Sequence, residues 1–361
     1  MARYKILGIT MKIYYQYSKC KTLPPKKGDY ITEINCILAL SKFADVYYSG
    51  SLFRPNEKRF GLREYTGSIY KRMKRQEYDA YFVRSNRELF MKIGKNKVKF
   101  WNAGNYSLEK EIFEAATAVY TRTETMQHVF TKGQKVWANP KGKIIKNVFV
   151  FPQPYGDAFV SQKESEKSKK IRKEVGGDFI IGCFGTLRKS NFPHLLISSL
   201  KYINKKSPLV KVLMGVTKDK NNSPKKEKNV ICKKYHYSVM PHVISACDLC
   251  IVNETGVTWN YLDSLKALEP AACKVPIVMP YADSRVEIMG SDYPLFLPMD
   301  VFKTPITKAK IKQFAEIIFR LMEDKDYYNS LCEEMPSRVD TCSIDSVSDR
   351  VKKDIMEYLN V

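Results

Sequence analysis

Acidic residues are scarce in this chain of 361 residues, in which 38 Asp and Glu stand against 61 Lys and Arg. The formal net charge of +23 disfavours a cationic partner and favours an anionic one, such as nucleic acid, an acidic membrane surface or a phosphorylated substrate. A Lys-rich composition inherited from an AT-rich genome explains the same charge. Both explanations stay open at this point.

Long apolar runs are also missing, and none is long enough to span a bilayer. Residues 1–10 have the pattern of a short strand, and their apolar core is too short for a secretory signal peptide. We therefore expect a cytoplasmic protein without a transmembrane segment. The positive charge is compatible with peripheral association at a membrane surface.

The cysteines offer no disulfide framework, because their number, nine, is odd and their positions are scattered. This usage is typical of reduced thiols in a cytosolic compartment. Cys247 and Cys250 form a CxxC pair, but no second pair lies at metal-ligand spacing, so buried structural thiols are favoured over a redox or zinc site. His194, His236 and His242 show no metal spacing either, and we expect neither a metal nor a cofactor.

Alternating apolar patterns predict two α/β halves, each with a mostly parallel sheet covered by helices. In the first half we expect strands at 5–10, 44–48, 78–83, 97–101 and 118–121, with helices at 30–42 and 108–116. In the second half we expect strands at 179–186, 209–215, 249–252 and 275–278, with helices at 193–202, 239–246, 308–322 and 347–359. Prolines and a glycine between 148 and 159 interrupt regular structure, and a charged segment at 162–174 follows, so the domain boundary is expected there.

Lys266 and Glu269 lie three residues apart near the start of a predicted helix, which places both side chains on one helix face. A cation and a carboxylate in that arrangement can bind a phosphate and the hydroxyls of a ribose. An ordinary surface ion pair explains the same spacing. The sequence around the pair favours the first interpretation.

Five segments, in this order along the chain, carry a resemblance to a known family. They are a hinge-like stretch at 151–159, a strand and loop at 181–189, a strand at 210–215, an Ala-Cys-Asp-Leu strand at 246–252, and the helix and strand at 265–278. With them the sequence resembles the GT-B glycosyltransferases, most closely the retaining sugar-nucleotide enzymes of glycosyltransferase family four. The resemblance covers roughly residues 150–360 and is only architectural before that.

The sequence departs from the family pattern at four positions. Tyr261 stands where the first of two Glu residues is usual, Lys274 replaces a common Gly, and Thr186 and Asn191 occupy the places of a phosphate-binding Arg and Lys. Arg188 and Lys189 lie in the same loop and can take over the phosphate contacts. The departures therefore leave individual phosphate contacts in question and not the position of the site.

The resemblance implies an α/β fold of two Rossmann-like domains facing a cleft. Residues 1–155 would bind the acceptor, residues 156–345 the nucleotide sugar, and the helix at 346–361 would cross back. The implied activity is transfer of a sugar from a UDP- or GDP-linked donor, retaining and independent of metal. We name no nucleophile, since the retaining step of the family is usually described as a front-face reaction assisted by the leaving phosphate.

Candidate site residues follow from the matched segments and from strand ends. Basic side chains are expected on the pyrophosphate, Glu269 on the ribose, and the remaining donor residues at strand ends; the donor set is Gly185, Arg188, Lys189, Asn253, Glu254, Lys266 and Glu269. The acceptor set combines two strand ends with a basic, aromatic-rich stretch at 54–75, and consists of Gly8, Arg84, Asn86, Arg59 and Arg63. A solvated helix face explains the basic stretch equally well.

Three functions stay open. The first is sugar transfer to an anionic acceptor, namely a phosphorylated or lipid-linked glycan. The second is a DNA-modifying glucosyltransferase of the viral type, which the charge and the Lys-rich region at 218–234 favour. The third is a non-catalytic, basic nucleic-acid-binding protein on a decayed transferase fold, which the altered phosphate loop keeps in play.

Overall fold

The computed structural model describes residues 11–17, 28–49, 62–65, 77–84, 86–103, 110–186, 193–206, 209–217 and 227–359. The chain divides into two compact units. The first unit contains Met1–Tyr155 and Thr341–Val361, and the second contains Gly156–Asp340. Each unit is built on a parallel sheet with its own core.

The first unit contains a parallel sheet with the strand order β3-β2-β1-β4-β5-β6-β7. The strands are β1 (Lys12–Tyr17), β2 (Asp45–Ser49), β3 (Leu62–Tyr65), β4 (Ala80–Arg84), β5 (Val98–Asn102), β6 (Ala118–Thr121) and β7 (Val148–Val150). The strand order reverses between β1 and β4. Open α/β sheets bind ligands at such a switch point, outside the carboxyl ends of the strands.

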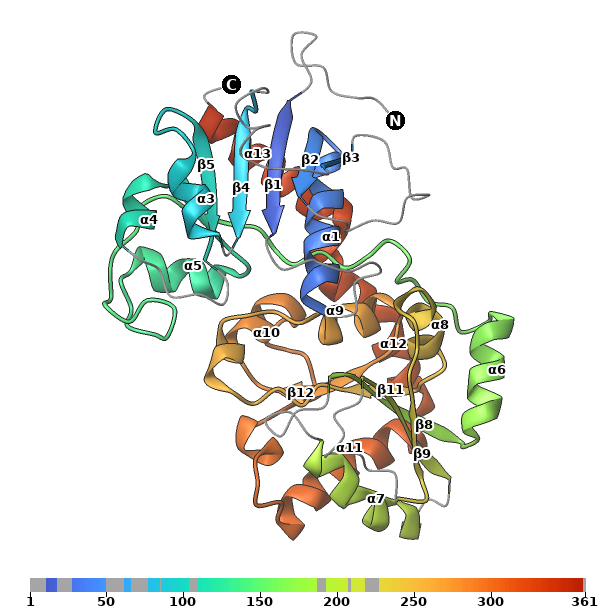
Figure 1. The fold of residues 1–361 in the computed structure, drawn as a ribbon. Helices are drawn as coiled ribbons and strands as arrows, with labels where there is room; N and C mark the ends of the chain where they lie inside the picture. Colours follow the sequence, from blue (N-terminus) through green and yellow to red (C-terminus); the bar gives the residue numbers. More distant parts are fainter. Residues whose placement is uncertain are drawn as a thin grey trace. The chain divides into compact units, whose positions relative to one another are not determined.

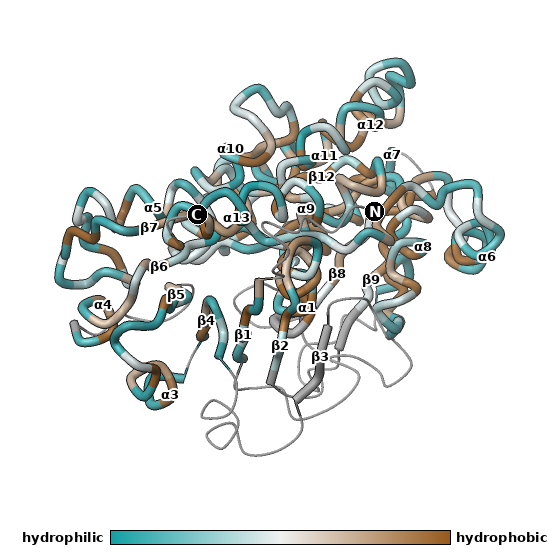
Figure 2. The backbone as a smooth tube through the Cα atoms, turned by 90° about the horizontal axis from the view of Figure 1, so that it is seen from above, coloured by the Kyte–Doolittle hydropathy of each residue, from teal (hydrophilic) through white to brown (hydrophobic). Residues whose placement is uncertain are grey.

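Helices cover both faces of the first sheet (Figure 1). They are α1 (Gly28–Ser41), α3 (Arg87–Lys92), α4 (Lys110–Ala115), α5 (Glu124–Thr131) and α13 (Ile344–Leu359). One core contains α1 and α13 packed against Ile13 and Tyr15, and the other contains α3 and α4 around Tyr14. Successive strand residues face opposite sides of a sheet, which accounts for this alternation. Figure 2 shows polar and apolar residues following one another along α3, of which Leu89 and Phe90 are buried, whereas α1 is buried along most of its length.

The C-terminal helix α13 belongs to the first unit, although the segment before it belongs to the second. Figure 1 shows α13, in red, beside α1, in blue. Val347, Val351 and Ile355 are fully buried in the same core as α1. The chain changes units at Asp340–Thr341, a few residues before the predicted position at 345–346.

The second unit has a parallel sheet with the strand order β10-β9-β8-β11-β12-β13. Its strands are β8 (Phe179–Thr186), β9 (Val210–Thr217), β10 (Val230–Lys233), β11 (Leu249–Ile251), β12 (Ile277–Pro280) and β13 (Phe296–Leu297). Its α-helices are α6 (Glu166–Val175), α7 (His194–Lys206), α8 (Met240–Ser245), α9 (Leu265–Ala272), α10 (Asp283–Met289), α11 (Lys308–Glu323) and α12 (Lys325–Val339). The switch point of this sheet lies between β8 and β11.

The structure corrects the sequence prediction in several places. Residues 148–150 form the edge strand β7, although the prolines that follow had suggested an end to regular structure. The sequence prediction missed β1, β3, β10, β13, α3, α5, α10 and α12. The predicted strand at 5–10 lies outside the described residues. No helix in the described part of the chain is long and apolar enough to cross a membrane.

Candidate functional site

The predicted donor residues gather at the switch point of the second sheet. Gly185 lies at the carboxyl end of β8, and Asn253 and Glu254 follow the carboxyl end of β11. The helix α9, which carries Lys266 and Glu269, begins shortly afterwards. Parallel strands present their carboxyl ends at one edge of a sheet, so residues far apart in sequence meet there.

Glu254 is the buried anionic centre of this group, with only 2% of its side chain exposed. Its Oε1 accepts a 2.6 Å hydrogen bond from Nζ of Lys266, and its Oε2 lies 3.7 Å from Nη2 of Arg285. Arg285 also donates to the carbonyl oxygen of Glu254 at 3.1 Å. Burial lowers the pKa of Arg285 to about 10, and the charge of Glu254 opposes that shift. The carboxylate is therefore held between two cations.

Lys266 lies directly over Gly185. A Cβ atom at position 185 would lie 2.6 Å from Cε of Lys266, which is closer than real Cβ contacts allow. Gly185 also has a φ of +109°, which L side chains rarely adopt. The backbone conformation thus favours glycine at the end of β8, and the end of the flexible Lys266 side chain would have to move to make room for any larger residue.

Glu269 is buried on the same helix and faces a different partner. Its Oε1 accepts a 2.6 Å hydrogen bond from the hydroxyl of Tyr237, whose ring packs against Phe159 with 5.4 Å between centroids. Burial raises the pKa of Glu269 to about 8, and the Tyr237 hydrogen bond opposes the rise. A buried carboxyl group with a displaced pKa at a strand-end site is typical of a functional position.

The contacts of Lys266 and Glu269 show whether the two residues form the surface ion pair that their spacing allows. Lys266 pairs with Glu254, twelve residues earlier, and not with Glu269. Neither side chain is exposed, since Glu269 is buried and Lys266 has 27% of its side chain exposed. An ordinary surface ion pair between the two residues is therefore absent.

The ends of α9 explain two features of the sequence. The side chain of Ser264 caps the helix by accepting a hydrogen bond from the N–H of Lys266. Beyond the other end, Lys274 has a φ of +60°, the one positive φ at a residue other than glycine in the described part of the chain. This left-handed position is where helices commonly end in glycine, which accounts for the Gly usual at this point of the family pattern.

The first unit has a second buried charged group, at the switch point between β1 and β4. Arg84, at the end of β4, and Arg122, just after β6, both donate hydrogen bonds to Glu33 of α1, the Arg122 bond at 3.3 Å. The hydroxyl of Tyr15 donates to the same carboxylate. Arg84 was predicted as an acceptor residue; Glu33 and Arg122 were not, because no local sequence pattern links them to it.

The structure describes some of the remaining predicted residues and not others. Asn86 caps α3, its side chain accepting a 3.0 Å hydrogen bond from the N–H of Leu89. Tyr261, at the place of the missing Glu, ends the short 3-10 helix η3 (Val257–Asn260) and is partly buried. Outside the described residues or side chains lie Gly8, Arg59, Arg63, Thr186, Arg188, Lys189 and Asn191, together with the greater part of 54–75 and of 218–228.

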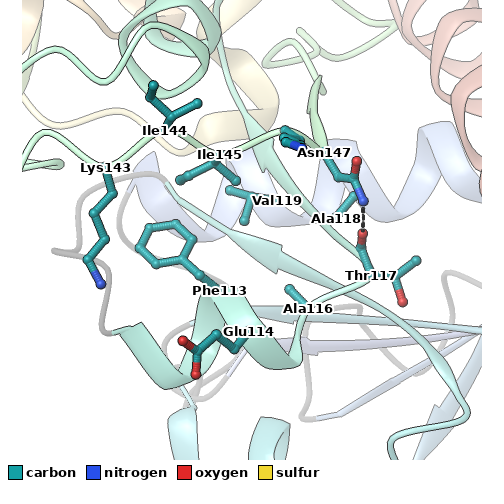
Figure 3. Close-up of a pocket in the computed structure, with 11 residues that line it drawn as sticks. Phe113, Glu114, Ala116, Thr117, Ala118, Val119, Lys143, Ile144, Ile145 and Asn147 are labelled. Atoms are coloured by element: carbon teal, nitrogen blue, oxygen red, sulfur yellow. Dashed lines mark hydrogen bonds between the residues drawn. The ribbon is translucent and has the colours of Figure 1, made fainter.

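A cavity of about 300 Å³ in the first unit lies away from these groups. It is lined by Phe113, Glu114, 116–119 and 143–147, at the amino ends of β6 and β7 (Figure 3). A 3.1 Å hydrogen bond from the Asn147 side chain to the carbonyl of Thr117 closes one side. Ligand groups of α/β sheets collect at the carboxyl ends, so this cavity is not the candidate site.

The CxxC thiols and the one Asp-x-Asp element of the second unit lie where a structural role explains them. Cys247 and Cys250 are buried free thiols, as expected for structural cysteines. The sequence contains one Asp-x-Asp element, Asp324–Asp326, but Asp324 caps α12 by accepting a 2.9 Å hydrogen bond from the N–H of Tyr327. Among the described residues, no three His, Cys, Asp or Glu are arranged to hold a metal ion.

No protein-family model matches the chain, and no curated protein sequence matches it. Solved structures do match. HepE of Anabaena in complex with UDP-glucose superposes with a TM-score of 0.67 at 14% identity, covering 96% of this chain and 100% of that one.

Two further structures agree. A glycosyltransferase from Rickettsia africae ESF-5 has a TM-score of 0.72 at 13% identity and covers 97% of this chain and 99% of its own. The α,α-trehalose 6-phosphate synthase from Burkholderia multivorans has a TM-score of 0.64 at 11% identity, with the same coverage. Identities this low establish the fold alone, and membership of family four stays a prediction. The protein has the fold of the GT-B glycosyltransferases.

Proposed function

We propose that this chain is a glycosyltransferase that takes a sugar from a nucleoside diphosphate sugar bound at the switch point of its second sheet. The observation that carries the proposal is the placement of Lys266, Glu254 and Glu269 together at that edge. The fold supports it, because HepE, which shares the fold, was solved with UDP-glucose. A UDP- or GDP-linked donor is therefore the expected substrate.

Lys266 is the proposed contact for the leaving pyrophosphate. Its position in the first turn of α9 is unfavourable for helix stability, since the dipole of a helix repels cations at the N-terminus. An anion, in contrast, is attracted by both the helix end and the ammonium group. Negative charge that develops on the leaving group would be stabilised there, and neither Lys266 nor the helix end would have to move.

Glu254 is proposed to position Lys266. It occupies one of the three ammonium donors of Lys266 and leaves the other two for phosphate oxygens. Because Glu254 is buried between Lys266 and Arg285, its proposed effect on the ligand is exerted through Lys266. Arg188 and Lys189 follow β8 in the sequence, and we expect them to add positive charge at the same place.

Glu269 is proposed to accept hydrogen bonds from the ribose hydroxyls. Its carboxyl group is already oriented by Tyr237, which leaves Oε2 for a ligand. From the family resemblance we extend the proposal to a retaining transfer that needs no metal. The acceptor is proposed to be anionic and to bind the first unit near Arg84, which fits the net charge of +23 and allows peripheral association with a membrane.

A thermal-shift panel of UDP-, GDP- and ADP-linked sugars tests the donor site. We expect at least one nucleotide to raise the melting temperature, because a ligand that binds only the folded state stabilises it. Glu269→Ala should abolish the shift, whereas Glu316→Ala, which removes an exposed carboxylate of α11, should keep it. A panel in which no nucleotide stabilises the protein would contradict the proposal.

DNA as the acceptor is the second candidate, and the net charge of +23 favours it. A DNA-modifying enzyme would bind duplex DNA with an affinity that falls steeply as salt rises, because binding releases counterions. Titration of labelled duplex at several salt concentrations separates the candidates. Nucleotide binding together with salt-sensitive duplex binding supports DNA modification, and nucleotide binding alone supports a glycan acceptor.

A further inference from the structure

An open pocket of about 520 Å³ lies at the carboxyl ends of β12 and β13 in the second unit. We propose that this pocket binds a neutral hexose unit, stacked on the exposed ring of Tyr281. The inference deepens the proposed function and rests on it. The volume is within the range of small-molecule sites, and the location is the edge at which open α/β sheets bind ligands.

Tyr281 offers a preformed aromatic surface. The residue is 50% exposed, unusual for a large aromatic, and its N–H donates a 2.7 Å hydrogen bond to the carbonyl of Leu297. Its ring meets Phe296 edge-on at 5.6 Å, and Phe296 meets the buried Tyr293 edge-on at 5.3 Å. The Tyr281 ring is therefore held in place from the core outward, with one part left to solvent.

The pocket wall carries groups that suit sugar hydroxyls. Asp283 is exposed at the start of α10, and Asn260 ends the 3-10 helix η3 on the other side. A carboxylate accepts hydrogen bonds from hydroxyl groups, and an amide both donates and accepts them. One face of a hexose ring presents C–H groups, which pack on an aromatic ring while the hydroxyls reach these polar side chains.

The charge of the pocket excludes a phosphate as its occupant. The described residues that line it include one carboxylate, Asp283, and neither Lys nor Arg, although the chain as a whole carries a net charge of +23. A phosphate would be repelled by Asp283 and would find no cation to bind. The pyrophosphate of a donor therefore belongs at Lys266, and a neutral group belongs here.

The helix α10 ties this pocket to the candidate donor site. The hydroxyl of Ser284 donates to the carbonyls of Trp259 and Leu262, at 2.9 and 3.1 Å, and so fixes the pocket wall. The next residue, Arg285, binds the backbone of Glu254, which holds Lys266. A hexose on Tyr281 would thus be either the glycosyl group of the donor or a sugar unit of the acceptor glycan.

Saturation-transfer NMR on the full chain, with methyl glycosides of glucose, galactose and N-acetylglucosamine as probes, tests the inference. We expect at least one glycoside to bind the wild type and to bind Tyr281→Ala about tenfold more weakly, the scale of a lost aromatic contact. Tyr281→Phe, which keeps the ring, should bind as the wild type does. Because Tyr281 is half exposed, the variants should fold.

Calorimetry with UDP and UDP-glucose on the same variants separates the outcomes. Unchanged UDP affinity in Tyr281→Ala supports the inference; weaker UDP-glucose binding then identifies the donor sugar, and unchanged UDP-glucose binding identifies an acceptor sugar. Loss of UDP binding in Tyr281→Ala, or the lack of any glycoside signal that depends on Tyr281, overturns the inference. Glycoside binding by a wild type that binds no nucleotide would instead overturn the proposed donor site.

Discussion

The buried surroundings of Glu269 oppose the ionisation of its carboxyl group. This side chain should therefore make the free energy of unfolding depend on pH. Burial raises its pKa to about 8 in the folded state, while the unfolded carboxyl group has a pKa near the ordinary value of 4.5. The folded protein thus retains a proton that the unfolded chain releases. The contribution of the protonated Glu269 side chain to the free energy of unfolding is fully present below about pH 4.5 and is lost as the pH rises towards about 8.

Glu269→Gln removes this titration and can keep the Tyr237 hydrogen bond. We expect the free energy of unfolding of the variant, relative to wild type, to rise by roughly 3 kcal/mol between about pH 5 and pH 8. Urea unfolding at a series of pH values measures the difference. A difference that stays constant across the series would mean that Glu269 is not the buried acid described here.

Glu33 is a second single residue whose substitution should change the free energy of unfolding. Glu33→Gln would leave the guanidinium groups of Arg84 and Arg122 buried without their carboxylate, which costs about 3–5 kcal/mol of unfolding free energy. The matched control is Glu77→Gln, since the Glu77 side chain is 92% exposed and its ion pair with Lys97 contributes at most about 1 kcal/mol. Equal losses in the two variants would contradict the assignment of a buried ion cluster.

Sequence patterns predicted part of these sites. Lys266 and Glu269 were found because their spacing is local and matches a family motif. Glu33 and Arg122 were not found, because they are 89 positions apart and meet only through the sheet. The pairing of Lys266 with Glu254 was missed for the same reason, since twelve residues and a helix cap separate them.

At the scale of elements, the end of β8 has to approach α9 closely. Gly185→Ala should displace the Lys266 side chain and place alanine in a strained backbone conformation, which lowers the free energy of unfolding by about 1–3 kcal/mol. The displacement of Lys266 should also weaken nucleotide binding. Gly256→Ala is the control, because its φ is −75° and its Cβ would lie 3.7 Å from Trp259. Nucleotide titrations compare the variants, and similar affinities for both would sink the close-approach argument.

The end of α9 gives a stabilising substitution. Lys274→Gly should raise the unfolding free energy by about 0.5–1 kcal/mol, because the left-handed backbone strains Lys and not Gly. The exposed ion pair between Lys274 and Glu333 contributes little. Lys274→Ala also loses that pair but keeps the strain, so it should show no gain in chemical denaturation. A gain in both variants would point to charge and not to backbone conformation.

Two long, periodic helices were predicted well, and several short strands were missed, although the four-residue strand β6 was predicted. The helix predicted at 30–42 is α1 (Gly28–Ser41), and the helix predicted at 308–322 is α11 (Lys308–Glu323). The strands β7 and β10 have only three and four residues, too few for a pattern to stand out from loops. In α12, an internal Pro336 disguises a helix of 15 residues.

At the scale of the whole molecule, two parallel sheets provide two switch points, and each carries buried ions. The second contains one carboxylate between Lys266 and Arg285, and the first contains one between Arg84 and Arg122. Both groups therefore have a cationic excess among the side chains named here, in a chain with a net charge of +23. This distribution suits a donor pyrophosphate at one sheet and an anionic acceptor at the other.

Binding of a nucleoside diphosphate by the second unit, through Lys266 and Glu269, is proposed above. Calorimetric titration of UDP into wild type, Glu269→Ala and Glu316→Ala measures this binding. We predict that wild type and Glu316→Ala bind alike and that Glu269→Ala binds at least about tenfold more weakly, as expected when hydrogen bonds to a buried carboxyl group are lost. Equal UDP affinity in all three proteins, or no binding to the wild type by UDP or by GDP, would contradict the claim.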